Sequence, residues 1–176
     1  MAELHVFGQI TGASEFATRN LLCKWCLIVG DGWTVLEGLR EGQTHVNFHH
    51  YEEISTWCHP VDIHLSTQGI QCWPKLYFQV WHQDHYGRND LCGYGICFVP
   101  STPGFHSLDC HIWRPLGSLS DEIARHFLGG SLHLQEPEST CGGGLDRFRL
   151  RTTGMGKIHL ELYVIQRNFQ KYGIET

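Results

Sequence analysis

The chain has 176 residues, of which 41% are hydrophobic and 18% are charged, and its formal net charge at pH 7 is −5. This length suits one domain with a substantial core, and the composition is typical of a globular protein and not of a disordered chain. The negative charge argues against a general nucleic-acid binder, whose affinity comes from neutralising phosphates. We therefore expect a globular protein with no nucleic-acid partner.

No export or membrane-spanning signal is apparent. The start, "MAELHVFGQI", lacks a basic segment followed by an apolar stretch, so it is unlike a secretory signal. The most apolar run, "LLCKWCLIV", contains Lys24 and is far shorter than the roughly 20 residues that span a bilayer. We expect a cytosolic chain without a transmembrane segment, in which the eight cysteines are free thiols or metal ligands.

Most segments alternate apolar and polar residues with a period of two, which is typical of half-buried strands. In chain order these runs are "ELHVFGQI", "LLCKWCLIV", "VDIHLS", "KLYFQV", "DRFRLR" and "GKIHLELYV". The second of them does not alternate but is apolar on both faces, as a central strand would be. Clusters of Gly, Pro, Asn and Asp separate the runs. Among them "TGMG" at 153–156 lies between the last two runs and predicts a hairpin there.

One segment, "SLSDEIARHFLGG", predicts a short helix at about 120–128. Ser120 suits the N-cap, acidic residues follow in the first turn, and Gly129 and Gly130 end the helical spacing of apolar residues. With about eight strands and this helix, the chain is predicted to be all-β, an eight-stranded antiparallel β-sandwich. No linker that would divide domains is found.

The sequence offers no clear catalytic or zinc-binding motif. Cys23 and Cys26 have the spacing of a zinc half-site, but in a strand residues i and i+3 point to opposite faces. We interpret the cysteines as small buried hydrophobic residues. The chain lacks a GxSxG elbow, an HExxH helix and a P-loop, and no cysteine–histidine pair stands out. We predict no enzymatic activity and no cofactor.

Two polar clusters are candidates for function. The loop "VWHQDHYGRND" gathers His82, Asp84, His85 and Asp90 after an apolar run, a composition that suits either a metal site or a loop with a structural or binding role. The second cluster is a set of three arginines at a spacing of two, which is either a basic stripe for an anionic lipid or acidic partner, or a solvated sheet face. These arginines are Arg147, Arg149 and Arg151.

The tract "WPKLYFQVWHQDHYGRNDLCGYG" resembles the third calcium loop of C2 domains, the calcium- and phospholipid-binding β-sandwiches. In those domains acidic residues at i, i+2 and i+8 bind calcium, and the matching positions here are His82, Asp84 and Asp90. The stretch that should face this loop, "TGASEFATRNLLCKW", has Glu15 and Asn20 and no aspartate. The resemblance therefore implies a degenerate calcium-type loop that binds no metal.

Over a longer span the chain resembles the B9 domain family, the divergent C2-like domains of ciliary proteins. The resemblance rests on four stretches and covers residues 2–170 as a single B9 (C2-like) domain. The stretches are "EGQTHV", "HPVDIHLSTQGIQCWPKLYFQVWHQDHYGRNDLCGYGICFVPSTPG", "HSLDCHIWRPLG" and "RNFQKYGIET".

This resemblance implies a non-enzymatic scaffold subunit of the ciliary transition-zone (tectonic-like, Meckel syndrome) complex. Such a subunit assembles with other B9 proteins and with transition-zone membrane proteins, and it supports ciliogenesis and the membrane-protein diffusion barrier. Its expected location is the cytoplasm and cytoskeleton, at the cilium basal body and transition zone.

The alternative is a calcium-independent phospholipid-binding C2-like module that contacts an anionic lipid surface. The contact candidates for either role are aromatic or basic residues of the loop and the arginine set: Trp81, Tyr86, Arg88, Arg147, Arg149 and Arg151.

Overall fold

A computed structural model of the chain describes residues 1–48, 54–69, 71–118 and 150–172, and the residues 120, 123, 133 and 134. These residues form nine strands and a short 3₁₀ helix: β1 (Ala2–Ser14), β2 (Leu21–Ile28), β3 (Trp33–Gly38), β4 (Glu41–Gln43), β5 (Ser55–Thr67), β6 (Lys75–Gln83), β7 (Asn89–Phe98), β8 (Gly104–Pro115), β9 (Thr152–Arg167) and η2 (Phe169–Tyr172). The expected all-β class is confirmed. The described residues contain nine strands where about eight were expected, and the three-residue β4 is too short to display a period of two.

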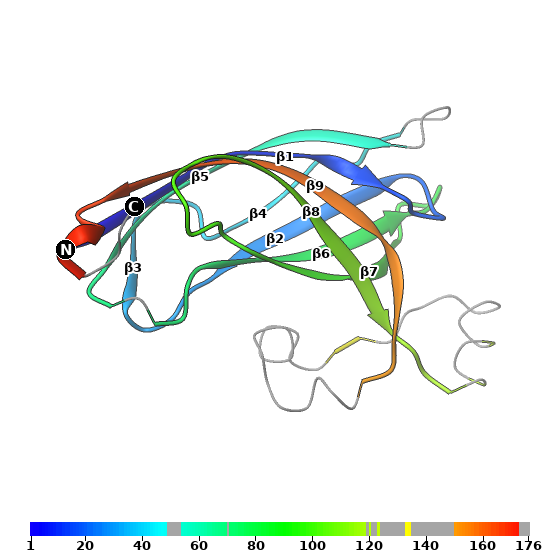
Figure 1. Ribbon diagram of the computed structural model, residues 1–176. Coiled ribbons are helices and arrows are strands. Elements are labelled where there is room, and N and C mark those ends of the chain that lie inside the picture. Colours follow the sequence, from blue (N-terminus) through cyan, green and yellow to red (C-terminus); the bar gives the residue numbers. More distant parts are fainter. Residues whose placement is uncertain are drawn as a thin grey trace.

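The nine strands form one antiparallel sheet in the order β3-β5-β1-β9-β8-β7-β6-β2-β4. The sheet folds over on itself where β8 meets β7, so that β1, β5 and β9 lie in one layer and β2 and β6 lie in the other (Figure 1). The layers enclose a hydrophobic core to which both contribute. This folded sheet is the β-sandwich that the sequence predicts.

The predicted alternation is confirmed in the strands that line the core. The residues predicted to point inward are at most 2% exposed: Val61, Ile63 and Leu65 of β5, Leu76, Phe78 and Val80 of β6, and Ile158, Leu160, Leu162 and Val164 of β9. Strand β6 is buried on its other face as well, because Tyr77 stacks on Tyr94 at 6.2 Å in a second, smaller cluster. The large aromatic ring of Tyr77 is therefore buried even though it points away from the main core.

The fold of the sheet depends on two glycines that flank Tyr94. Strands β7 and β8 pair through Tyr94 with Trp113 and through Gly95 with Ile112, and through no further described residue. A Cβ at Gly93 would lie 2.8 Å from both Cγ2 of Ile112 and the carbonyl oxygen of Trp113. A Cβ at Gly95 would lie 2.4 Å from Cδ1 of Ile112. Glycine is required at both positions because a side chain would overlap β8 where the sheet turns over.

The hairpin predicted at 153–156 is wrong. Strand β9 runs through this segment and stays paired with β8, with a register shift between Ile112 and Trp113. Gly156 instead permits close packing, since a Cβ there would lie 2.6 Å from ring carbons of Phe16. The glycines that suggested a turn accompany a β-bulge inside a long, bent strand.

The remaining sequence expectations fall mostly on undescribed residues. Of the helix predicted at about 120–128, the structure describes Ser120 and Ile123, and both are helical. Of the predicted strand "DRFRLR", it describes Leu150 and Arg151, which belong to no strand. The other residues of both segments lie outside the described part of the chain.

We expect Gly93→Ala to lower the free energy of unfolding by about 2 kcal/mol, because the new methyl group would overlap the backbone of β8. The matched control is Gly154→Ala in β9, opposite Trp113 on the other side of β8, where an added Cβ meets no heavy atom within 4 Å. Urea unfolding of both purified variants measures the difference. Equal midpoints for the two variants would contradict this role of Gly93.

Candidate functional site

The loop between β6 and β7 lies beside the loop between β1 and β2 at one end of the sandwich. Leu21 pairs with His82 in the ladder, and the N–H of Gln83 donates to the carbonyl oxygen of Asn20 at 3.0 Å. The imidazole Nδ1 of His82 donates to the carbonyl oxygen of Arg19. The two loops that resemble the calcium loops of C2 domains in sequence are thus adjacent, and His82 joins them.

Asp84 stabilises its own turn. Its Oδ1 accepts hydrogen bonds from the backbone N–H groups of Tyr86 and Arg88, both at 2.8 Å. Gly87 closes the turn with a φ of 79°, a left-handed conformation that favours glycine. The carboxylate therefore serves as a turn cap, and a caged cation would compete with these two N–H donors for its oxygen.

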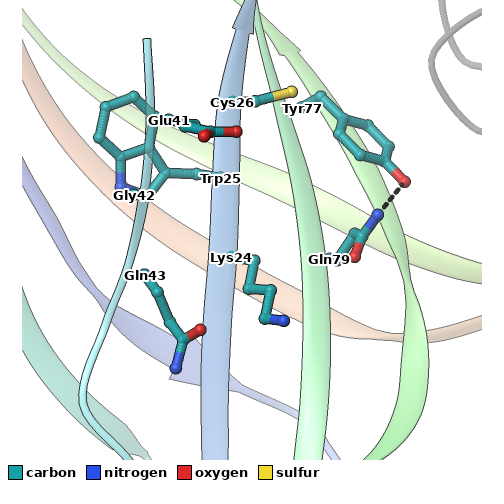
Figure 2. Close-up of a pocket in the computed structure, with 8 residues that line it drawn as sticks. All are labelled: Lys24, Trp25, Cys26, Glu41, Gly42, Gln43, Tyr77 and Gln79. Atoms are coloured by element: carbon teal, nitrogen blue, oxygen red, sulfur yellow. Dashed lines mark hydrogen bonds between the residues drawn. The ribbon is translucent and has the colours of Figure 1, made fainter. Parts of the chain in front are cut away.

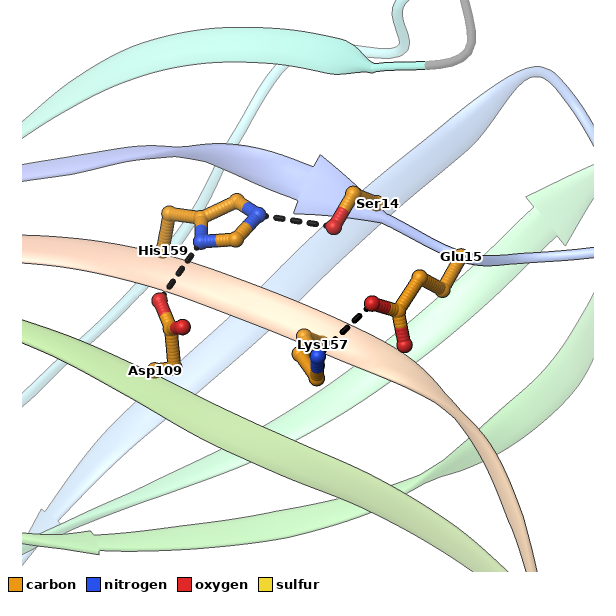
Figure 3. Close-up of polar contacts among 5 residues, drawn as sticks. All are labelled: Ser14, Glu15, Asp109, Lys157 and His159. Carbon is orange, nitrogen blue, oxygen red and sulfur yellow. Dashed lines mark hydrogen bonds and ion pairs between the residues drawn. The ribbon is translucent and has the colours of Figure 1, made fainter.

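The other potential metal ligands near the loop, which are two carboxylates and an imidazole, do not converge on Asp84. Asp90 is paired with His82 across the ladder, and His85 is exposed. Glu15, the carboxylate of the facing loop, bonds Nζ of Lys157 at 2.7 Å and so turns toward β9 (Figure 3). Among the residues that the structure describes, no three His, Cys, Asp or Glu side chains are placed to hold a metal ion.

The contact candidates of the loop separate into a tip and a flank. Tyr86 is 87% exposed, and the guanidinium of Arg88 lies 5.9 Å from its ring, so these two residues form the tip. Trp81 is half-buried on the flank, where Nζ of Lys24 lies 5.2 Å from its ring and the His133 ring lies at 5.9 Å. Tyr86 and Arg88 are therefore exposed at the tip, whereas Trp81 is partly covered by neighbouring side chains.

Of the three arginines, the structure describes Arg151 alone. Arg151 is exposed, and its carbonyl oxygen accepts the N–H of Leu116 at 2.8 Å. Arg147 and Arg149 lie outside the described residues, so the basic stripe stays a prediction.

The cysteines of "CKWC" lie on opposite faces of β2, as the strand geometry predicts. Cys23 belongs to the main core, whereas Cys26 packs against the smaller cluster around Tyr77. Burial raises the pKa of the Cys23 thiol well above its ordinary value, and burial raises that of Cys97 to about 11. These thiols therefore stay protonated at neutral pH, and none of the described cysteines forms a disulfide.

A surface hollow of about 450 Å³ lies over β2, β4 and β6 (Figure 2). It is lined by Lys24, Trp25, Cys26, Glu41, Gly42, Gln43, Tyr77 and Gln79. Its polar groups are of mixed character, and the amide of Gln79 donates to the hydroxyl of Tyr77 at 3.0 Å. The hollow offers hydrogen bonds to a ligand but no paired nucleophile and base among these residues.

A Ser-His-Asp relay lies on the outer face of the other layer (Figure 3). Nδ1 of His159 donates to Oδ1 of Asp109 at 2.7 Å, and Nε2 accepts from the hydroxyl of Ser14 at 2.8 Å. These distances match those of a hydrolase triad. The relay lies on an open sheet face, however, and the backbone N–H groups along the described ladder of β1, β9 and β8 bond to neighbouring strands. No oxyanion hole therefore forms beside Ser14 from this part of the chain.

Sequence reasoning missed a row of three aromatic residues on the same face, of which two are exposed and Phe7 is half-buried. Phe7, Tyr163 and Phe105 occupy directly paired positions on β1, β9 and β8, and we call these three residues the aromatic row. The Tyr163 ring lies 5.3 Å from Phe7 and 4.9 Å from Phe105. Ile165 follows on β9 and is 53% exposed. The sequence contained a signal for this row, because its residues are apolar at positions that point outward in alternating strands.

Comparisons with known proteins identify the family. The structure defines the class, an all-β antiparallel sandwich. A family model described as "Ciliary basal body-associated, B9 protein", whose name pairs B9 with C2, matches residues 4–165. The chain belongs to this B9 family, which confirms the resemblance seen in the sequence and its C2-like class.

Full-length relatives agree with this assignment. The chain is 50% identical to B9 domain-containing protein 2 of Danio rerio over 176 residues, which cover all of both chains. It is 50% identical to B9 domain-containing protein 2 of Homo sapiens over 175 residues, or 99% of each chain. It is 25% identical to B9 domain-containing protein 1 of Mus musculus, covering 98% of this chain and 86% of the relative.

A structural neighbour was also found. The C2A domain of plant Extended Synaptotagmin 1 matches 95% of this chain and 96% of its own length, with 14% identity and a TM-score of 0.48. Among the described residues of the present chain, no helix is sufficiently long and apolar to cross a membrane.

We expect Ser14 to stay unlabelled by a fluorophosphonate probe, because an absent oxyanion hole alone costs a serine nucleophile about 100-fold or more in rate. Intact mass spectrometry after incubation measures the label, with trypsin as the positive control. A probe adduct on Ser14 that disappears in His159→Ala would contradict this expectation and identify a hydrolase.

Proposed function

We propose that the chain is a non-enzymatic scaffold subunit of the ciliary transition-zone (tectonic-like, Meckel syndrome) complex. In this role it forms a single B9 domain over residues 2–170 and assembles with other B9 proteins and transition-zone membrane proteins. It supports ciliogenesis and the diffusion barrier for membrane proteins at the cilium base. The observation that carries this proposal is the match of a basal body-associated family across residues 4–165.

The arrangement of polar groups supports a binding role over a catalytic one. The groups that could do chemistry serve the fold: Asp84 caps its turn, His82 joins two loops and His159 links Asp109 to Ser14. Apolar side chains, in contrast, are presented to solvent on an ordered sheet. Such exposed patches commonly mark protein contacts.

The alternative function is calcium-independent binding to an anionic lipid surface. The loop tip favours it, because Tyr86 and Arg88 combine an exposed aromatic ring with a cation. The nearby carboxylates of Asp84 and Asp90 oppose it. We therefore place lipid contact second to protein assembly.

The test is co-purification of the tagged chain from ciliated cells. We expect other B9 proteins to be recovered in near-stoichiometric amounts, and the tag to localise to the cilium base. The loop-tip variant Tyr86→Ser/Arg88→Glu should retain these partners, since we assign the loop tip to the alternative lipid role. Recovery of no B9 protein would contradict the scaffold proposal.

Vesicle flotation distinguishes the lipid-binding function from protein assembly. Binding to phosphatidylserine-containing vesicles without calcium, weakened by salt and lost in Arg88→Glu, would favour the lipid module. Co-purification without vesicle binding would leave the scaffold function as the better account.

A further inference from the structure

We propose that the outer face of β1, β5, β8 and β9 docks a different protein whose contact surface has an apolar centre surrounded by lysine and arginine. This inference rests on the proposed scaffold function and assigns the surface that performs it. Its centre is the aromatic row with Ile165, and its rim consists of carboxylates on the same four strands.

The centre is apolar, ordered and open to solvent. Tyr163 is 46% exposed and Phe105 is 53% exposed, although each ring already packs against a neighbour. Their positions are fixed by the ladder, in which Tyr163 pairs with Phe7 on one side and Phe105 on the other. A partner would bury these rings without first ordering them, which lowers the entropic cost of binding. Aromatic side chains of this kind dominate the energetics of interfaces.

Two of the three strands of the row cannot recruit a partner by strand addition, whereas β8 pairs with β7 only through Ile112 and Trp113 among the described residues. Strand β1 is paired with β5 and β9, and β9 is paired with β1 and β8, so their backbone groups already bond to one another. Contact with Phe7 and Tyr163 must therefore occur through their side chains, which stand above the sheet. This favours a packed protein surface over an extended peptide that adds to a sheet edge.

The rim is acidic. The outward carboxylates on these strands and the adjoining loop are Glu3, Glu15, Asp62, Asp109 and Glu161, against the cations Lys157 and Arg167. Both cations are already paired, Lys157 with Glu15 at 2.7 Å and Arg167 with Glu3 at 3.5 Å. With histidine counted as neutral, the face therefore carries a net negative charge at pH 7.

Two of the carboxylates remain available to a partner. Asp62 is 75% exposed and Asp109 is 55% exposed in their side chains, even though each accepts a hydrogen bond from an imidazole at 2.7 Å. A carboxylate has several acceptor positions, so each can take a further donor. Asp62 lies beside Phe7 in the register, and Asp109 lies two outward positions from Phe105.

This charge pattern selects the occupant. A second copy in a two-fold contact would place carboxylates against carboxylates, and an anionic membrane would be repelled. Arginine satisfies both parts of the surface, because guanidinium binds carboxylates in a bidentate manner and stacks on aromatic rings. The surface therefore fits a different protein that presents arginine and lysine around an apolar patch.

The test is photo-crosslinking of the full-length chain in ciliated cells, with p-benzoyl-phenylalanine in place of Phe105. The matched control carries it in place of Phe98, which is 59% exposed on β7, outside the docking face. We expect a covalent product at 105 and none at 98. Mass spectrometry should place the crosslink on a different protein, in a peptide containing lysine or arginine.

Charge variants sharpen the test. Asp62→Asn with Asp109→Asn, introduced into the position-105 chain, should lower the crosslinking yield about threefold or more, as should added salt. Thermal melting of each purified variant confirms that the exposed substitutions leave the fold intact.

The other outcomes overturn the inference in distinguishable ways. A product at 98 alone would exclude this face while leaving the scaffold function in place. A crosslink at 105 to a second copy, to lipid or to an acidic peptide would contradict the proposed occupant. Products at neither position, with no partner recovered by co-purification, would overturn the inference and the proposed function together.

Discussion

The close approach of β7 and β8 at Gly93 and Gly95 is the constraint on which the rest of the structure depends. With side chains larger than hydrogen at these two positions, Ile112 and Trp113 could not lie against β7 as they do. The sheet would then lose the place where it turns over into two layers. Tyr94, between the two glycines, points away from this contact, is 2% exposed and belongs to the smaller cluster.

The folded sheet in turn fixes the surfaces that are available for function. Strand β8 pairs with β7 through two residues but with β9 along its whole length. That long pairing brings Phe105 beside Tyr163, and β1 adds Phe7 on the other side. The aromatic row is therefore a product of register across three strands that are distant in the sequence.

The potentially reactive side chains described above mainly form hydrogen bonds that stabilise the fold. Asp84, His82 and His159 each have geometry that would suit chemistry elsewhere, yet each bonds to a neighbouring backbone or side chain. The Ser14–His159–Asp109 relay is the strongest case. It has triad distances, but it lies on a paired sheet face and not in a cleft. Distances alone do not define an active site, since stabilisation of the developing charge contributes much of the rate.

Local patterns allowed part of this structure to be predicted. The alternation in β5, β6 and β9 identified the core-facing residues, because one buried face imposes a period of two. The opposite orientation of Cys23 and Cys26 followed from the same geometry. The similarity to B9 domains came from longer tracts, and the family match confirms it.

Other features required information that the sequence does not carry locally. Glycine signals both turns and close packing, so "TGMG" was misread as a hairpin although Gly156 lies under Phe16. The role of Asp84 depended on which N–H groups its carboxylate reaches. The aromatic row needed the register of three strands, which alternation within each strand cannot supply.

Docking of a partner on the β1, β5, β8 and β9 face is the proposed mode of action of this chain. Hydroxyl-radical footprinting of the complex purified from ciliated cells, compared with the chain alone, tests it most directly. The predicted result is lower oxidation of Phe105 and Tyr163 in the complex, with Tyr86 and Phe98 unchanged. Protection of Tyr86 or Phe98, with equal oxidation of Phe105 and Tyr163 in both samples, would contradict it.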